Sequence, residues 1–425
     1  MSPADRRRLG SISLGAIVAA NMIGAGVFTT SGYALADLGA RGPVMLAWVL
    51  GGVIALLGAA SYSALAARLS ESGGEYLFLS RTLHPRLGFV AGWVSIWAGF
   101  TGAVALAAEA AQAYLEPWIP DGVPLDLVGS AAIVAAGIVH ASGVHRGARL
   151  QNVVVGLKLA VLVVFVLIGA TQLEPQPTPP ARDFDFATFA STMMWVSLSY
   201  SGWNAAVYVA GEARDPESTL PRSMLGATGV VTVLYLALNW IFVSAAPVAQ
   251  LAGEADVAAV AARAIGGAPL ESLVRVVLVI ALLTSVSSMV MIGPRVLARM
   301  ADDGRLPAFL AFRGDVPRAA IWTQVALSVA ILWASGLREQ LTNLGWILSL
   351  FTALSVLGLV RLRAREGAER VPVLGYPLVP LVFVIAVLGL AAVMLVTSAA
   401  ELWPALILFA LGLLTEKYGT AFVFP

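Results

Sequence analysis

The first long apolar stretch of the chain, residues 11–36, contains the sequence Asn21-Met22-Ile23-Gly24-Ala25-Gly26-Val27-Phe28. Gly24 and Gly26 fall near the middle of a stretch that is long enough to cross about 30 Å of hydrocarbon as a helix. Small residues are common where membrane helices pack closely, so helix packing is one interpretation. The other is a break in the helix, because glycine readily adopts the backbone angles that an unwound turn needs.

A second apolar stretch, residues 187–210, has an interruption at a corresponding place. It contains Ser199-Tyr200-Ser201-Gly202-Trp203-Asn204, and Gly211-Glu212-Ala213-Arg214-Asp215-Pro216 follows it. The two stretches are the first and the sixth of the apolar series, so they open two halves of five stretches each, about 10–171 and 187–360. An odd number of crossings inverts the second half. Paired interrupted helices in inverted halves are typical of secondary transporters and indicate the substrate site.

The composition indicates that most of the chain lies in a membrane. Of its 425 residues, 59% are hydrophobic and 12% are charged, and soluble domains carry about twice that charged fraction. We expect an all-α membrane protein with one domain over residues 1–425 and two additional helices at about 374–415. A short segment, 253–268, is expected to form an interfacial helix. The twelve expected spans are 11–36, 43–66, 86–114, 124–142, 150–171, 187–210, 221–245, 270–299, 319–336, 339–360, 374–396 and 399–415.

The placement of Lys and Arg predicts the orientation. Most of these residues fall in loops that share one side of the expected topology, among them the run Arg6-Arg7-Arg8 and the cluster at 361–365. Because cytoplasmic loops carry an excess of Lys and Arg, we expect both termini to be cytoplasmic. The chain is expected to be a multi-pass protein of the cell (inner) membrane in contact with lipid, and its oligomeric state is left open.

Several classes of protein are disfavoured by what the sequence lacks. The chain has no cysteine, and its three histidines, His84, His140 and His145, are scattered without metal-ligand spacing. It has no Walker A sequence and no grouping of a nucleophile with a base. We therefore expect no metal site, no cofactor, no catalytic residue, no ATP-driven pumping and no nucleic-acid partner.

Two neighbouring helix breaks would form a binding site from the backbone itself. An intact helix satisfies its own amides and carbonyls and has none to offer a solute. Unwinding at Gly24–Gly26 would free amides at the positive end of a half-helix, which suit a carboxylate. Unwinding at Leu198–Ser201 would free carbonyls, which suit an ammonium group. The pair of breaks therefore predicts a site for a zwitterion.

The stretches Ile23–Phe28, Tyr200–Asn204, Gly211-Glu212 and Arg295–Pro307 resemble the amino acid–polyamine–organocation superfamily, and the resemblance covers essentially the whole chain. It implies a LeuT-like fold of five plus five inverted helices with two extra helices. Trp203-Asn204 is similar to the L-type amino acid transporter branch, with Trp203 as a cap on the pocket and Asn204 as a polar pocket or gating group. The resemblance also assigns Ile23, Gly24, Ala25 and Gly26 to the substrate carboxylate and amine, and carbonyls of Leu198, Ser199 and Ser201 to substrate binding.

Lys158 is a charged residue well inside the expected span 150–171. A charge inside a membrane helix is costly and indicates function, although a lysine near a helix end can instead extend to the interface. In Na⁺-coupled relatives a sodium ion lies between the first and eighth helices, and in proton-linked or uncoupled relatives a lysine takes that place. Lys158 resembles that lysine. Its expected partners are carbonyls of Ala20 and Ile23 and hydroxyls of the eighth helix, at Thr284, Ser287 and Ser288.

These observations predict a Na⁺-independent secondary transporter of amino acids that works by alternating access. The leading hypothesis is proton-coupled uptake of neutral L-amino acids, in which Lys158 could carry the proton. The alternatives are obligatory amino acid exchange, a permease for polyamines or cationic amino acids, and a sensor built on a transporter fold. Glu109, in the outer third of the third span, is either a vestibule residue or a carboxylate near the membrane interface.

Overall fold

The computed structural model describes residues 9–71, 73–142, 147–174, 176–177, 183–314 and 316–418, with the backbone alone at 147–155 and 417–418. The basic run Arg6–Arg8 and His145 lie outside the described residues. Regular structure in the described part of the chain is helical, apart from one β-bridge between Leu9 and Ala213.

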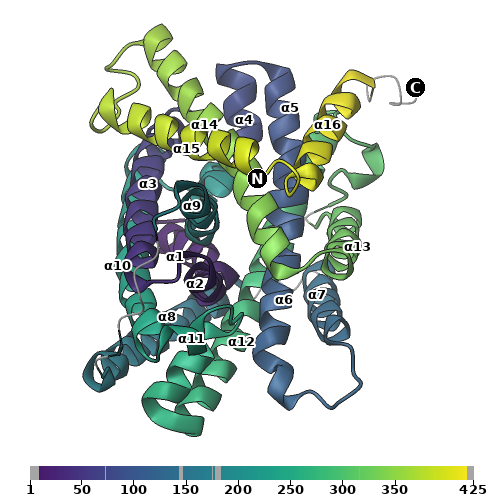
Figure 1. Ribbon diagram of the computed structural model, residues 1–425. Coiled ribbons are helices and arrows are strands. Elements are labelled where there is room, and N and C mark those ends of the chain that lie inside the picture. The colour runs from purple at the N-terminus through teal and green to yellow at the C-terminus, as the bar shows by residue number, and fades with distance from the viewer. Residues whose placement is uncertain are drawn as a thin grey trace.

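The helices are shown in Figure 1 in chain order. They are α1 (Ser11–Met22), α2 (Ala25–Leu38), α3 (Arg41–Arg68), α4 (Gly74–Thr82), α5 (Pro85–Val94), the π-helix η2 (Ser95–Gly102), α6 (Ala103–Leu115), η3 (Glu116–Trp118), α7 (Leu125–Ala141), α8 (Gly147–Gln172), α9 (Phe186–Tyr200), η4 (Ala205–Glu212), α10 (Pro216–Ser244), α11 (Val248–Leu251), α12 (Val257–Asp302), η5 (Ala308–Leu310), α13 (Arg318–Ala334), α14 (Leu337–Glu366), α15 (Leu378–Thr397) and α16 (Trp403–Tyr418).

Seven helical stretches among the described residues are long and apolar enough to cross a membrane. They are Ser11–Leu38, Arg41–Arg68, Pro85–Trp118, Pro216–Ser244, Val257–Asp302, Leu337–Glu366 and Leu378–Thr397. Shorter apolar helices accompany them at Leu125–Ala141, Gly156–Gln172, Arg318–Ala334 and Trp403–Glu416. The chain is therefore an all-helical, multi-pass membrane protein. Each expected span overlaps one of these stretches or the pair α9–η4.

Both expected helix breaks are present. The helix α1 ends at Met22 and α2 begins at Ala25, so the backbone leaves the helical path at Ile23 and Gly24. The helix α9 ends at Tyr200, and a turn over 201–204 leads into the 3-10 helix η4. The first unwound segment is shorter than expected, because Gly26 lies in the first turn of α2. The second begins later along the chain than expected, because Leu198 and Ser199 lie inside α9.

The segment 253–268, which was expected to form an interfacial helix, contains the first turns of α12. The helix α12 begins at Val257, and non-helical backbone angles at Gly266 and Gly267 separate residues 257–265 from the rest of it. Val257, Ala258 and Ala261 are completely buried. Small alanine side chains allow this short helix to pack closely against the protein, while Arg263 and Ala264 on its other face are exposed, so its position at the membrane surface stays a prediction.

The two broken helices lie in the middle of the bundle. The helix α2 packs on α9, and α1 packs on α10. The helix α3 contacts both α9 and α10, while α12 packs along α6. Figure 1 shows α1, α2 and α9 at the centre, with α3 and α10 on one side and α6 on the other. The breaks are therefore enclosed by the surrounding helices of the bundle.

Candidate functional site

The two helix breaks are in direct contact. Gly202 has a φ of +100°, in the region that favours glycine. A β-carbon at this position would lie 2.6 Å from the carbonyl carbon of Asn21. Glycine therefore allows the turn after α9 to approach the end of α1 at a distance that any other residue would prevent.

The start of α2 offers backbone amides at the first break. The first turn of a helix leaves its amides without partners inside the helix, and the helix dipole makes this end positive. The N-cap residue Gly24 provides no side-chain cap. A β-carbon on Gly24 would have the Met22 carbonyl oxygen, 3.9 Å away, as its nearest neighbour. The space beside Gly24 is therefore open, and the adjoining Ala25 begins the helix.

Gly26 does not face open space. A β-carbon there would lie 2.4 Å from the Ser199 hydroxyl oxygen and 2.7 Å from the Ser199 α-carbon. The Ser199 hydroxyl is itself 2.9 Å from the Thr30 hydroxyl and donates to the Trp195 carbonyl oxygen over 2.8 Å. Gly26 thus serves the close packing of α2 on α9, which is the helix-packing interpretation of this glycine.

Several carbonyl oxygens at the breaks have hydrogen-bond partners within the protein. The Tyr235 hydroxyl, on α10, donates to the Met22 carbonyl oxygen at 2.5 Å and lies 3.2 Å from that of Ser199. The Leu198 carbonyl oxygen accepts the Ser201 amide over 2.9 Å. Tyr235 was not identified from the sequence, because a tyrosine in an apolar helix carries no signal of which backbone oxygen it will contact.

Lys158 reaches the first break from α8. Its side chain is 5% exposed, and its ammonium group donates to the Ile23 carbonyl oxygen. The Ser285 hydroxyl of α12 lies 3.3 Å from the same oxygen and 3.1 Å from the Ala281 carbonyl oxygen of its own helix, so its proton is available to either. Ala20 lies buried in the last turns of α1. A lysine and a serine from two different helices therefore meet at one freed carbonyl.

The hydroxyls of α12 do not all face Lys158. Ser287 is 2.9 Å from the His140 ring nitrogen of α7, and Thr284 donates to the Ala281 carbonyl oxygen of its own helix. Ser288 is buried. The expectation placed Ser287 beside Lys158, and this was wrong because two residues along a helix turn the side chain by about 200°. Ser285 occupies the expected place.

Trp203 and Asn204 lie in the turn that follows α9. The Trp203 side chain is buried, and its ring packs edge-on against Tyr62 at 4.8 Å and against Phe383 at 6.1 Å. The Asn204 amide donates to a Glu75 carboxylate oxygen over 2.7 Å. Trp203 therefore points toward α3 and α15, whereas Asn204 points toward the start of α4.

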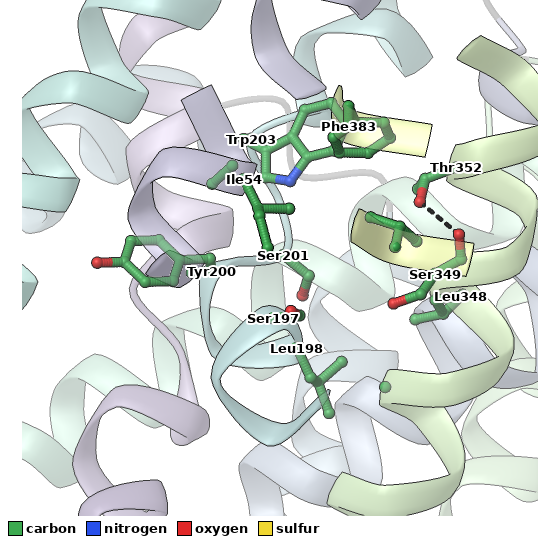
Figure 2. Close-up of a pocket in the computed structure, with 14 residues that line it drawn as sticks. Ile54, Ser197, Leu198, Tyr200, Ser201, Trp203, Leu348, Ser349, Thr352 and Phe383 are labelled. Carbon is green, nitrogen blue, oxygen red and sulfur yellow. Dashed lines mark hydrogen bonds between the residues drawn. The ribbon is translucent and has the colours of Figure 1, made fainter. Parts of the chain in front are cut away.

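Two small cavities adjoin the second break. The central cavity, of about 110 Å³, is lined by Asn21, by residues 201–205 and by Phe100 and Leu348, among others. The smaller cavity, of about 50 Å³, is lined by Leu198 and Ser201, among others. Figure 2 shows Trp203 and Phe383 at one end of this smaller cavity, with Ser349 and Thr352 of α14 on its far side.

A third and wider cavity, of about 900 Å³, lies between η4 and the end of α12 that carries Arg295 and Arg299. Tyr208 and Ile292 line both this wide cavity and the central one. The side chains of these two residues therefore form part of the partition between the two spaces.

Glu75 is a further residue of this region that the sequence did not single out. Its side chain is 3% exposed and accepts hydrogen bonds from Tyr62, Asn204 and Tyr208. A possible signal was the pair Gly73-Gly74 directly before it, since two adjacent glycines favour an unusual turn. Glu109, by contrast, is half-buried in α6 and accepts the Gln340 amide over 2.7 Å.

Comparisons with known proteins agree with this architecture. The family model described as amino acid permease matches residues 9–415. The branched-chain amino acid permease BcaP of Lactococcus lactis is 24% identical, over 82% of this chain and 80% of its own length. The large neutral amino acids transporter small subunit 2 of Rattus norvegicus is 24% identical, over 89% and 74%.

The serine/threonine exchanger SteT of Bacillus subtilis is 25% identical, over 90% of this chain and 89% of its own length. These relatives are named as transporters or permeases rather than enzymes, and the family model spans all the membrane helices described above. The chain belongs to the amino acid permease family, within the amino acid–polyamine–organocation superfamily of membrane transporters.

Proposed function

We propose that this chain is a Na⁺-independent amino acid carrier that works by alternating access and takes up neutral L-amino acids together with protons. In this proposal the substrate lies between the two helix breaks, with its carboxylate at the amides that begin α2. The five helices of about 10–171 and the five of about 187–360 form inverted repeats, and the helices of about 374–415 are additions to them.

The observation that carries the proposal is the contact of Lys158 with the Ile23 carbonyl oxygen. The Lys158 amino group, which is a cation when protonated, already occupies the carbonyl oxygen at which the family resemblance places a sodium ion, and the Ser285 hydroxyl lies 3.3 Å from the same oxygen. A second cation at that oxygen would meet a like charge in a medium of low dielectric constant. This arrangement favours a carrier that does not need Na⁺.

The lining of the central cavity favours neutral substrates. Phe100, Ile292 and Leu348 are apolar, and the one acidic side chain in the described lining, Glu75, is engaged by three donors. A cationic amino acid or a polyamine would need an acidic group with free acceptor capacity. The relatives, named for branched-chain, large neutral, serine and threonine substrates, support the same class.

Obligatory exchange is the second candidate, because one relative is named an exchanger. A lysine that keeps its proton throughout the cycle would serve an exchanger equally well, by holding α1, α8 and α12 together. We also propose that the chain lies in the cell membrane with both termini cytoplasmic. The wide cavity then opens to the cytoplasm, where Arg295 and Arg299 at its mouth follow the positive-inside rule.

The test is uptake of labelled leucine and of labelled serine into liposomes that contain the purified protein. A symporter accumulates label when the outside is acidic and the interior holds no amino acid. An exchanger accumulates label only when the interior is loaded with unlabelled amino acid, whatever the pH gradient. Arginine and spermidine serve as the cationic comparison. Uptake of these cations in preference to leucine and serine would contradict the proposed substrate class.

A further inference from the structure

Glu75 is a buried carboxylate at the start of a short helix. It is the second residue of α4 and follows Gly73 and Gly74, whose φ values of +152° and +57° suit glycine. Burying a carboxylate is costly unless it is hydrogen-bonded. The first turn of a helix lowers that cost for an anion, but a side chain that is 3% exposed needs further partners.

Three donors from three places in the chain supply those partners. The Tyr62 hydroxyl of α3 lies 3.1 Å from one carboxylate oxygen, and the Asn204 amide lies 2.7 Å from the same oxygen. The Tyr208 hydroxyl of η4 donates to the other oxygen. Hydrogen bonds to an ionised acceptor are roughly twice as strong as those between neutral groups. Glu75 therefore joins α3, α4 and the second half of the broken sixth span.

The carboxylate lies at the partition between two cavities. Glu75 lines the central cavity, and its partner Tyr208 lines both the central and the wide cavity. The Tyr208 ring packs edge-on against Phe100 at 5.2 Å. On its other side the ring lies so close to Gly74 that a β-carbon there would be 2.2 Å from it. The Tyr208 ring is thus held between α4 and η2.

The segment that carries Tyr208 has little regular structure to hold it in place. The helix η4 is of the 3-10 type, with non-helical angles at Val209. Hydrogen bonds in 3-10 helices have poorer geometry than those of α-helices, and such segments often mark hinges. The helix η4 packs against α1 and α10 and ends at the β-bridge between Leu9 and Ala213, and the hydrogen bonds of Asn204 and Tyr208 to Glu75 connect this segment to α4.

We propose that Glu75 is a positioning residue for transport: by holding Asn204 and Tyr208, it keeps the partition between the central and the wide cavity closed. Release of these two side chains lets η4 move and joins the central cavity to the wide one. The proposal rests on the proposed function in one respect, namely that the central cavity is where the substrate lies. The carboxylate itself does not have to touch the substrate.

The experiment uses the absence of cysteine in the natural chain. Met289 lines the central cavity but not the wide one. Met289→Cys therefore introduces a single thiol on the central-cavity side of the partition. The rate of its reaction with a charged methanethiosulfonate reagent is measured on the purified protein in detergent. The variants added to this background are Glu75→Gln, Tyr208→Phe and, as a matched control, Tyr76→Phe.

Tyr76 makes the control informative. It lies on α4 next to Glu75, and its hydroxyl also donates to a carboxylate, that of Asp303, over 2.9 Å, but outside the partition. We expect Glu75→Gln and Tyr208→Phe to raise the labelling rate about tenfold, the effect of losing one charge-assisted hydrogen bond, and Tyr76→Phe to leave it unchanged. Equal rates in all four proteins, or an increase in Tyr76→Phe as large as in Tyr208→Phe, would overturn the proposal.

A second measurement separates positioning from a general loss of stability. Glu75→Asp retains the charge but shortens the side chain, so it should label faster than the parent protein while its thermal unfolding temperature stays near that of Glu75→Gln or above it. If Glu75→Gln does not fold, Tyr208→Phe decides the question alone. Because labelling needs no substrate, failure of the amino acid uptake assay would not alter these rates, and the two proposals can fail separately.

Discussion

Gly26 and Ser199 lie so close that a β-carbon on Gly26 would stand 2.4 Å from the Ser199 hydroxyl oxygen and 2.7 Å from the Ser199 α-carbon. The second distance matters more, because a side chain can rotate away whereas a backbone atom can move only with its helix. The contact therefore fixes how closely α2 approaches α9, and it lies within one helical turn of both breaks.

We expect Gly26→Ala to destabilise the folded protein. The added methyl group must push α2 and α9 apart, and overpacking of this kind costs about 1–3 kcal/mol. The measurement is the thermal unfolding temperature in detergent, which should fall clearly below that of the parent. An unfolding temperature equal to the parent's would show that the two helices are not in close contact.

Gly24→Ala is the matched comparison and should behave in the opposite way. Its β-carbon would have no neighbour closer than 3.9 Å, and Gly24 has a negative φ of −116° that alanine tolerates. We expect the unfolding temperature to stay near the parent's and the KM for leucine to rise, because the methyl group stands beside the amides that begin α2. A normal KM would place the substrate carboxylate elsewhere.

The sequence predicted that both helices would break, but not whether Gly24 or Gly26 stands in the first break. A glycine at the unwound turn and a glycine at a helix crossing look alike in one sequence, and Gly24 and Gly26 are only two residues apart. What separates them is the position of Ser199, which lies far along the chain. The long apolar helices were predicted well, since hydropathy is a local property of each stretch.

Tyr235 provides the next test, because its hydroxyl contacts carbonyl oxygens at both breaks. Tyr235→Phe keeps the ring and leaves the Met22 oxygen with the Gly24 amide as its remaining donor, so the loss of the hydroxyl should cost about 0.5–1.5 kcal/mol. It should also lower the transport rate, since the two breaks are no longer tied to α10. Labelled leucine uptake and thermal unfolding are the measurements.

Tyr200→Phe is the control for this variant. The two rings are 5.0 Å apart, but the Tyr200 hydroxyl donates to the Trp48 carbonyl oxygen within the continuous helix α3. We expect a similar loss of stability and a smaller loss of transport than in Tyr235→Phe. Equal losses of transport in both variants would mean that Tyr235 acts through stability alone.

The polar partners of the site were predicted less well than the breaks. The sequence offers hydroxyls at Thr284, Ser285, Ser287 and Ser288, which are spread over about 160° of the helix surface, so pattern alone cannot choose which of them meets Lys158. Glu75 was missed for a related reason. Its three donors come from residues 62, 204 and 208, and only the tertiary fold brings them to one carboxylate.

Replacement of sodium tests the proposed role of Lys158 without any mutation. Uptake of labelled leucine should be the same in NaCl and in choline chloride at constant pH, because the Lys158 ammonium already contacts the Ile23 carbonyl oxygen. The KM should be unchanged as well. Loss of uptake in choline would mean that a sodium ion binds at another place, and the proposal of a Na⁺-independent carrier would then fail.

Lys158→Arg tests whether this residue carries the proton. Arginine keeps the positive charge but effectively cannot release its proton, so a proton-coupled carrier should lose accumulation driven by a pH gradient. Lys158→Met is the comparison that removes the charge and leaves the Ile23 carbonyl oxygen with Ser285 as its remaining side-chain partner. This variant should impair both accumulation and exchange, because the Ile23 carbonyl oxygen no longer has the lysine amino group as a partner.

The difference between the two variants distinguishes the candidate functions. Exchange of internal for external leucine, measured without a pH gradient, should survive in Lys158→Arg if the bulkier guanidinium group fits between α1, α8 and α12. Retained exchange with lost pH-driven accumulation would identify Lys158 as the proton carrier of a symporter. If Lys158→Arg still concentrates leucine against its gradient when the outside is acidic, the proton travels by another group. Glu109, a half-buried carboxylate bonded to Gln340, is then the next residue to substitute.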